Sequence, residues 1–123
     1  MARPSKVRMV AFKPKYYEFK PKGVPSTELE KVELAMDELE AVRLADYEGL
    51  DHEEAAELMG ISRPTFSRLV EKARRKVAEM LIESKELVIE GGSVEFVRRH
   101  RCRRCGKETG FLGSKHKCKK VEK

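Results

Sequence analysis

Residues 49–68 read GLDHEEAAELMGISRPTFSR, and their order predicts two helices joined by a tight turn. Asp51 is suited to cap the first helix, and Gly60 is suited to the left-handed conformation in which a helix ends. Ser62 is a second N-cap, and the helix behind it tolerates a proline near its start. Ile61 is expected to fill the corner between the helices. The stretch therefore has the layout of a helix-turn-helix.

Helical periodicity continues on both sides of this block. Upstream, the pattern predicts helical sequence from Leu29 onward and a helix that is capped by Asp37 and ended by Gly49. Downstream, one apolar stripe predicts that the helix beginning at Ser62 extends to about Lys85. The stripe consists of Phe66, Leu69, Val70, Ala73, Val77 and Leu81.

The flanking segments favour strands instead of helices. Four of the five prolines lie within residues 1–25, where they exclude a long helix, and alternation predicts strands at Val7–Phe12 and Tyr16–Phe19. Beyond the helices, Leu87–Ile89 and Val94–Val97 are apolar runs separated by Gly91-Gly92, which predicts a β-hairpin.

The expected fold is mainly α, with a three-helix core, short N-terminal strands, a C-terminal β-hairpin and a small Cys/His tail. Three segments follow from this. Residues 1–25 are a basic arm with short strands, residues 26–97 are the helix-turn-helix domain with its hairpin, and residues 98–123 are a basic Cys/His tail that resembles an incomplete zinc ribbon. A chain of 123 residues has room for one modest core of this kind.

Charge alternates sharply along the chain, although the net charge is only +6. Residues 1–25 carry seven basic side chains and one acidic side chain, whereas residues 26–62 carry two basic and twelve acidic side chains. Residues 63–85 hold seven basic against three acidic side chains, and residues 98–123 hold eleven against two. Three separate basic segments favour a polyanionic partner such as nucleic acid.

Several classes of protein are excluded by what the sequence lacks. No apolar run is long enough for a membrane span, and the first residues lack the hydrophobic core of a signal peptide, so a cytoplasmic location is expected. No nucleophile, base and orienting group are suggested together, and no phosphate-binding loop occurs. We therefore expect neither an enzyme nor a small-molecule substrate.

The helix that begins at Ser62 carries side chains suited to a DNA major groove, because arginine can bind guanine with two hydrogen bonds and Ser or Thr can contact bases or phosphates. The candidates for base contacts are Arg63, Thr65, Ser67 and Arg68. The candidates for phosphate contacts are Lys72, Arg75 and Lys76. The alternative is an ordinary three-helix core whose basic face is merely solvated.

The N-terminal arm offers a second contact. Arg3 or Lys6 is suited to enter an adjacent minor groove, as N-terminal arms of some three-helix DNA binders do. A frayed terminus that leads into an ordinary strand explains the same composition.

All three cysteines lie in the basic tail, where a C-x-x-C-G knuckle is followed by a second Cys/His pair. The predicted ligand set for a structural zinc ion is Cys102, Cys105, His116 and Cys118. A second C-x-x-C pair is missing, so His100 competes with His116 as the fourth ligand. A decayed site without metal, and a redox or iron-sulfur role, remain alternatives.

The block from Glu38 to Val77 resembles the helix-turn-helix of region 4 in bacterial sigma factors of the seventy type. Across residues 2–106, the chain resembles an uncharacterised family of small prokaryotic predicted DNA-binding proteins. The matching motifs are Ala2-Arg3-Pro4-x-Lys6, Phe19-Lys20-Pro21-x-Gly23-x-Pro25, Asp37-Glu38-Leu39-Glu40-Ala41-x-Arg43-Leu44-Ala45-Asp46 and Ala73-Arg74-x-Lys76-Val77-Ala78. The resemblance implies DNA binding.

The sequence therefore predicts sequence-specific binding to double-stranded DNA, with the role of a transcriptional regulator. A homodimer is expected, because one small recognition helix rarely reads enough base pairs alone. Two alternatives stay open: an RNA-binding or ribosome-associated protein, favoured by the basic tail, and a protein-interaction adaptor that uses the acidic segment 28–57.

Overall fold

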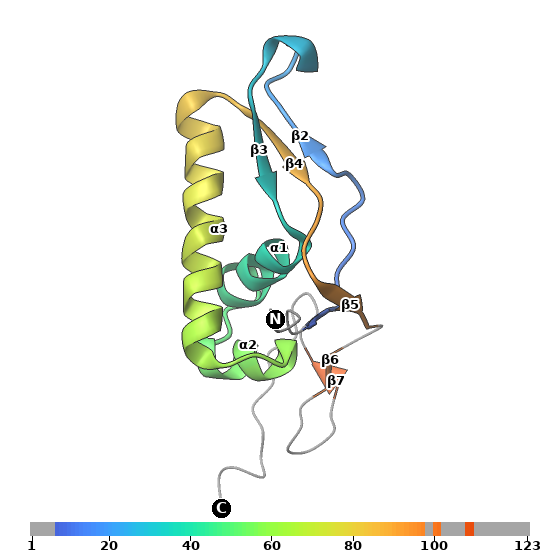
Figure 1. Ribbon diagram of the computed structural model, residues 1–123, viewed down its shortest axis with the longest axis vertical. Coiled ribbons are helices and arrows are strands. Elements are labelled where there is room, and N and C mark those ends of the chain that lie inside the picture. Colours follow the sequence, from blue (N-terminus) through green and yellow to red (C-terminus); the bar gives the residue numbers. More distant parts are fainter. Residues whose placement is uncertain (1–6, 98–99, 102–107, 110–123) are drawn as a thin grey trace, which may run out of the picture.

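The computed structural model describes residues 7–97, 100–101 and 108–109 (Figure 1). Its helices are α1 (Met36–Val42), which continues into the π-helical segment η2 (Arg43–Tyr47), α2 (His52–Met59) and α3 (Arg63–Glu83). In Figure 1, α3 runs along one side of the molecule, with the long strands beside its upper half and with α1 and α2 beside its lower half. Within the described residues, none of the helices combines the length and the apolar character needed to span a bilayer.

The helix boundaries follow the predicted caps with one exception. Asp51 and Ser62 are the N-caps of α2 and α3, and Gly49, at φ +78°, follows η2. Asp37 was predicted to be the N-cap of α1, which is wrong, because Ala35 holds that position. There the backbone N–H of Ala35 donates to the Glu38 carboxylate at 2.9 Å, so the acidic side chain inside the helix caps the backbone before it.

The predicted helical sequence from Leu29 is also wrong. After a single 3₁₀ turn, η1 (Ser26–Glu28), the chain forms the strand β3 (Lys31–Leu34). Within β3, Val32 and Leu34 are buried, whereas Lys31 and Glu33 are exposed. This alternation with a period of two is typical of a half-buried strand. The apolar positions resemble a helical spacing only when Leu29 is counted with Val32 and Met36.

The main sheet has the strand order β2-β4-β3, where β2 is Glu18–Phe19 and β4 is Glu86–Ile89. Strand β4 is central, since it pairs antiparallel with β2 and parallel with β3. Neighbouring parallel strands need a crossover connection, and here the crossover contains all of α1, α2 and α3. The helices are thus inserted between two strands of one sheet, so the domain is mixed α/β and not mainly α.

The predicted C-terminal β-hairpin is wrong because of this strand order. Both edges of β4 are occupied by β2 and β3, so the following strand, β5 (Val94–Phe96), cannot pair with β4. Instead, β5 pairs parallel with β1 (Arg8–Val10). The predicted N-terminal strands are confirmed as β1 and β2, although both are shorter than expected. A further antiparallel pair joins β6 (His100–Arg101) to β7 (Glu108–Thr109).

Gly92 is required where the chain passes from β4 to β5. Its φ is +100°, and a Cβ atom there would lie 3.0 Å from Asp37 Oδ1 and 3.3 Å from Ala35 Cβ. The link therefore needs glycine both for its backbone angle and for its close approach to the start of α1.

Helix α3 connects two hydrophobic clusters. Its first half contributes Phe66, Leu69 and Val70 to the cluster between the helices, and Ala73 belongs to the cluster under the sheet. Beyond this point the predicted apolar stripe loses its burial, since Val77 is half-buried and Leu81 is 66% exposed. The first half of α3 is therefore the more fully buried half of the helix.

The acidic segment does not form one solvated face. Four of its twelve carboxylates, those of Asp37, Glu38, Glu40 and Glu48, are buried. Arg43 donates to Glu40 at 2.8 and 2.9 Å and to Glu48 at 3.1 Å, which ties α1 to the end of η2. Two of the buried carboxylates are thus matched by the same internal cation.

Candidate nucleic-acid interface

The junction between α2 and α3 is held by caps and by one backbone turn. Asp51 Oδ1 accepts from the backbone N–H of Glu54 at 2.7 Å, which fixes the start of α2. Gly60 ends α2 in the left-handed conformation at φ +74°, and the N–H of Ile61 donates to the carbonyl of Ala56 at 3.0 Å. Ser62 Oγ accepts from the N–H of Thr65 at 3.3 Å and opens α3. The direction of α3 relative to α2 is therefore set by local sequence.

Small side chains allow the two helices to approach closely. Ala55 and Ala56 are at most 2% exposed, and Ile61 packs against the same cluster from the turn, as the sequence predicted. Phe66, one turn into α3, is fully buried in this cluster. One face of the start of α3 thus packs against α2, and its opposite face is exposed to solvent.

His52 supports the start of α3 through a contact that the sequence analysis did not predict. Its Nδ1 lies 2.8 Å from Ser67 Oγ, in a hydrogen bond whose direction depends on the histidine tautomer. Its ring also meets the Phe66 ring edge-on, with centroids 5.3 Å apart. No local pattern reveals the contact, because 15 residues separate His52 from Ser67.

The predicted base-contacting residues divide into two pairs. Arg63 and Arg68 are exposed, and neither has a hydrogen bond or ion pair with any residue that the structure describes. Thr65 and Ser67 are half-buried, and their hydroxyls are engaged with Ser62 at 2.8 Å and with His52, respectively.

The three predicted phosphate contacts also differ. Lys72 and Arg75 are exposed and have no ionic partner among the described residues. Lys76 Nζ instead donates to the buried Glu38 Oε1 at 2.8 Å, so its charge is used to hold α3 against α1.

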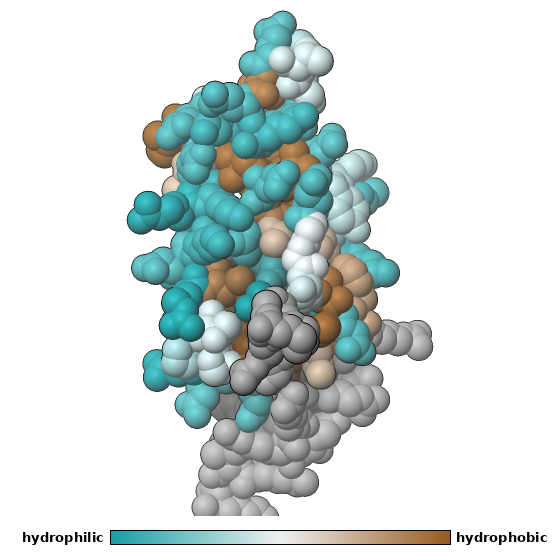
Figure 2. All heavy atoms as spheres, in the orientation of Figure 1, coloured by the Kyte–Doolittle hydropathy of each residue, from teal (hydrophilic) through white to brown (hydrophobic). Residues whose placement is uncertain are grey.

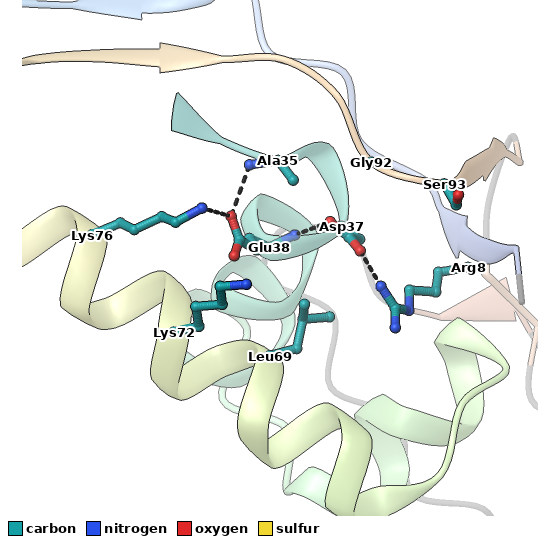
Figure 3. A pocket seen from close by; sticks show the side chains of 9 residues that line it. All are labelled: Arg8, Ala35, Asp37, Glu38, Leu69, Lys72, Lys76, Gly92 and Ser93. Atoms are coloured by element: carbon teal, nitrogen blue, oxygen red, sulfur yellow. Dashed lines mark hydrogen bonds and ion pairs between the residues drawn. The ribbon is translucent and has the colours of Figure 1, made fainter. Parts of the chain in front are cut away.

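The ion pair between Lys76 and Glu38 lines a pocket of about 280 Å³ beside α3 (Figure 3). Arg8 forms a second ion pair there with Asp37, and Figure 3 shows the Lys72 side chain extending from α3 toward the same space. Arg8 Nε is buried without a hydrogen-bond partner. Arg8 is therefore held against the start of α1, beside the same pocket that α3 lines.

Arg74, on another side of α3, is paired with Asp46 of η2 through contacts of 2.6 and 3.0 Å. The hydrogen bonds from this guanidinium hold the pKa of Asp46 below its ordinary value. Both side chains are largely exposed, so the pair adds little to stability, but it does remove Arg74 from the set of free cations.

The remaining predicted site residues lie outside the described residues. They are Arg3, Lys6, Cys102, Cys105, His116 and Cys118, together with the side chain of His100. Within the part of the chain that the structure describes, no group of three or more His, Cys, Asp or Glu side chains is placed to hold a metal ion.

The described residues thus form a small mixed α/β domain, in which a capped two-helix unit exposes uncompensated cations. The chain belongs to the family described as "Protein of unknown function DUF134", whose model matches residues 1–97. It is 58% identical over 109 residues to a UPF0251 protein of Chloroherpeton thalassium, a match that covers 88% of this chain and 72% of the relative.

Two further relatives carry the same name. A UPF0251 protein of Desulforudis audaxviator is 51% identical over 109 residues, covering 88% of this chain and 71% of that protein. One of Halothermothrix orenii is 48% identical over 107 residues, covering 86% and 79%. No solved structure matches the chain significantly.

Proposed function

We propose that this protein binds double-stranded DNA through a helix-turn-helix formed by α2 and α3, and that it acts in the cytoplasm as a sequence-specific regulator of transcription, not as an enzyme. The observation that carries the proposal is the set of exposed cations on the first four turns of α3. They are Arg63, Arg68, Lys72 and Arg75, and none has an ionic partner among the described residues.

The contrast with the internal cations supports this assignment. Arg8, Arg43 and Lys76 each have a buried carboxylate partner, so the domain compensates positive charge where it needs it for folding. Uncompensated arginine and lysine on a rigid, N-capped helix are what a major groove and its phosphates require. Thr65 and Ser67 would then assist by fixing the start of the helix as well as by contacting DNA.

The test uses double-stranded fragments that the full chain selects from a pool of fragmented DNA of the source genome. Arg68→Ala is expected to weaken binding to a selected fragment by about 5- to 150-fold and to reduce its preference over random DNA, since a bidentate arginine contact carries about 1–3 kcal/mol of discrimination. Lys72→Ala is expected to weaken both DNAs alike and to reduce the slope of log K against log salt by about one.

Lys22→Ala is the matched control. It removes the same charge from the exposed loop between β2 and η1, at the opposite end of the molecule from the start of α3 (Figure 1). Its binding should equal that of the parent. The proposal is wrong if the Arg68 and Lys72 variants bind like this control, or if single-stranded RNA of the same length displaces the selected duplex.

The Cys/His tail is proposed to hold one structural zinc ion. Three thiolates and one imidazole are a donor set that zinc prefers, and the surrounding lysines and arginines favour the thiolate form. The purified parent is expected to contain one zinc per chain by elemental analysis, and Cys105→Ser should contain almost none. Separate His100→Ala and His116→Ala variants identify the fourth ligand. A parent that neither contains zinc nor takes it up when reduced would refute the site.

A further inference from the structure

The pocket beside α3 is small, and charged side chains make up most of its lining. Three cations and two carboxylates line it, so one positive charge is in excess. They are Arg8, Lys72, Lys76, Asp37 and Glu38. Its volume of about 280 Å³ lies at the lower limit for small-molecule sites, which are usually lined by hydrophobic and aromatic side chains. No aromatic residue is among the described residues that line this pocket. The pocket therefore suits a small anion and not a large apolar ligand.

The two carboxylates of the pocket are already used within the fold. Asp37 accepts from Arg8 and, at 2.9 Å, from the backbone N–H of Glu38. Glu38 Oε1 accepts from Lys76 at 2.8 Å and from the N–H of Ala35 at 2.9 Å. Both carboxylates are buried, and each is compensated by a cation. They therefore repel an anion less than free carboxylates would, and a metal cation would have to displace Arg8 or Lys76.

Arg8 brings unused donors to the pocket. A guanidinium carries several N–H groups, and only Nη1 of Arg8 is bonded to a described residue. Its Nε is buried and has no hydrogen-bond partner. A buried donor without a partner costs about 1–3 kcal/mol, so this N–H calls for an acceptor from outside the described residues.

Two other elements add donors to the same pocket. Figure 3 shows Lys72 extending from α3 toward the pocket and Ser93 on the link between β4 and β5, on the other side. Neither side chain has a hydrogen bond or ion pair with any described residue. The backbone N–H groups of Gly92 and Ser93 have no partner there either. Cationic and neutral donors from three elements thus surround one small space.

We infer that this pocket binds a phosphate group, held by Arg8, Lys72 and Ser93. Phosphate oxygens accept hydrogen bonds from several directions at once, and arginine and lysine are their usual cationic partners. Serine hydroxyls and backbone N–H groups bind phosphate as well. Two sources supply such a group, the backbone of a bound duplex and a free phosphorylated molecule. The first source rests on the proposed function, whereas the second does not.

The pocket adjoins the cationic surface of α3. At about 100° per residue, Lys72 lies about 40° around the helix axis from Arg68 and about 40° from Lys76. Lys72 is therefore placed between an exposed arginine and a residue that lines the pocket. Figure 2 shows hydrophilic residues over most of the left side of the molecule, along which α3 runs. A backbone phosphate in the pocket would thus anchor a duplex to β1 and to the link before β5, as well as to α3.

Proton–nitrogen NMR spectra of the full chain without DNA test the pocket directly. The resonances of Arg8 Nε–H and of the backbone N–H groups of Gly92 and Ser93 are expected to shift on titration with inorganic phosphate. They should shift less with acetate at the same pH and ionic strength, because acetate has only two acceptor oxygens. Ser93→Glu adds a carboxylate at the pocket and is expected to raise the phosphate dissociation constant by about tenfold or more.

Thr27→Glu is the matched control. It adds the same charge at an exposed position of η1, and its phosphate titration should equal that of the parent. Positions 27 and 93 are both exposed, so neither substitution should unfold the domain, and thermal denaturation checks this.

The same resonance distinguishes the two sources once a selected duplex is bound. If a backbone phosphate occupies the pocket, the duplex itself shifts Arg8 Nε–H and free phosphate then has no further effect. If the pocket serves a free phosphorylated molecule, phosphate shifts Arg8 Nε–H in the complex as it does in the chain alone. Either result supports the phosphate site.

The inference is overturned if phosphate does not move Arg8 Nε–H, if acetate moves it equally, or if Ser93→Glu binds phosphate like the parent. The proposed function is judged by duplex binding alone. A chain that takes up phosphate in the pocket but binds no duplex refutes only the proposed function, and a chain that binds duplex without phosphate in the pocket refutes only this inference.

Discussion

Replacing Phe66 with alanine is expected to lower the free energy of unfolding by about 3–5 kcal/mol, the usual cost of truncating a fully buried phenylalanine. Phe66 is the first buried residue of α3, and it packs in the cluster with Ala55, Ala56 and Leu69. Its ring also forms a T-shaped contact with the His52 ring. The truncation therefore leaves a cavity at the point where α3 is attached to α2. Urea denaturation measures the loss.

Phe19→Ala is the matched control for this prediction, because it removes the same atoms from a side chain that is 47% exposed on the edge strand β2. Its cost should be about 1 kcal/mol or less. If the two variants lose similar stability, Phe66 is not the anchor of α3. At temperatures where Phe66→Ala is still folded, its DNA affinity reports how far groove binding depends on a fixed start of α3.

Replacing Glu40 with alanine is expected to cost about 3 kcal/mol, the lower end of the usual range for breaking a buried ion pair, because Arg43 keeps its contact with Glu48 at 3.1 Å. The Glu40 carboxylate is fully buried and accepts from the Arg43 guanidinium and from the backbone N–H of Ala11 at 2.8 Å. It thereby connects α1 both to η2 and to the segment after β1. Denaturation in urea, at a pH where carboxylates are ionised, measures the effect.

Two variants define the origin of that loss. Glu40→Gln keeps the shape and one acceptor oxygen, so it should lose less than Glu40→Ala. Glu33→Ala removes a carboxylate from an exposed position of β3 and should stay within about 0.5 kcal/mol of the parent. A loss in Glu40→Ala no larger than in Glu33→Ala would contradict the structural role given to the buried carboxylate.

The buried carboxylates also change the interpretation of the acidic segment. A protein-interaction adaptor would need residues 28–57 to present a continuous acidic surface, whereas Asp37, Glu38, Glu40 and Glu48 are buried. Arg8, Arg43 and Lys76 are bound to these carboxylates, which compensate their charges. The remaining free cations of the described residues on α3 therefore carry more of the argument for a polyanionic partner than the net charge does.

Local sequence was sufficient for the unit formed by α2 and α3. The caps Asp51 and Ser62, the left-handed Gly60 and the corner residue Ile61 act within a few residues of one another, so their geometry follows from backbone preferences that neighbouring residues satisfy. The exposed positions of Arg63, Arg68 and Lys72 follow from the helical period once the buried stripe is known.

Only the tertiary structure determined which strands pair and which charges remain free. The order β2-β4-β3 depends on the contact of β4 with β3, across the whole helical insertion, and this pairing excludes the hairpin that Gly91-Gly92 suggested. In the same way, Lys76 and Lys72 have equivalent chemistry in the sequence, but Glu38, 38 residues away, binds Lys76. Long-range contacts of this kind leave no periodic trace in the chain, since they depend on the packing of elements that are distant in sequence.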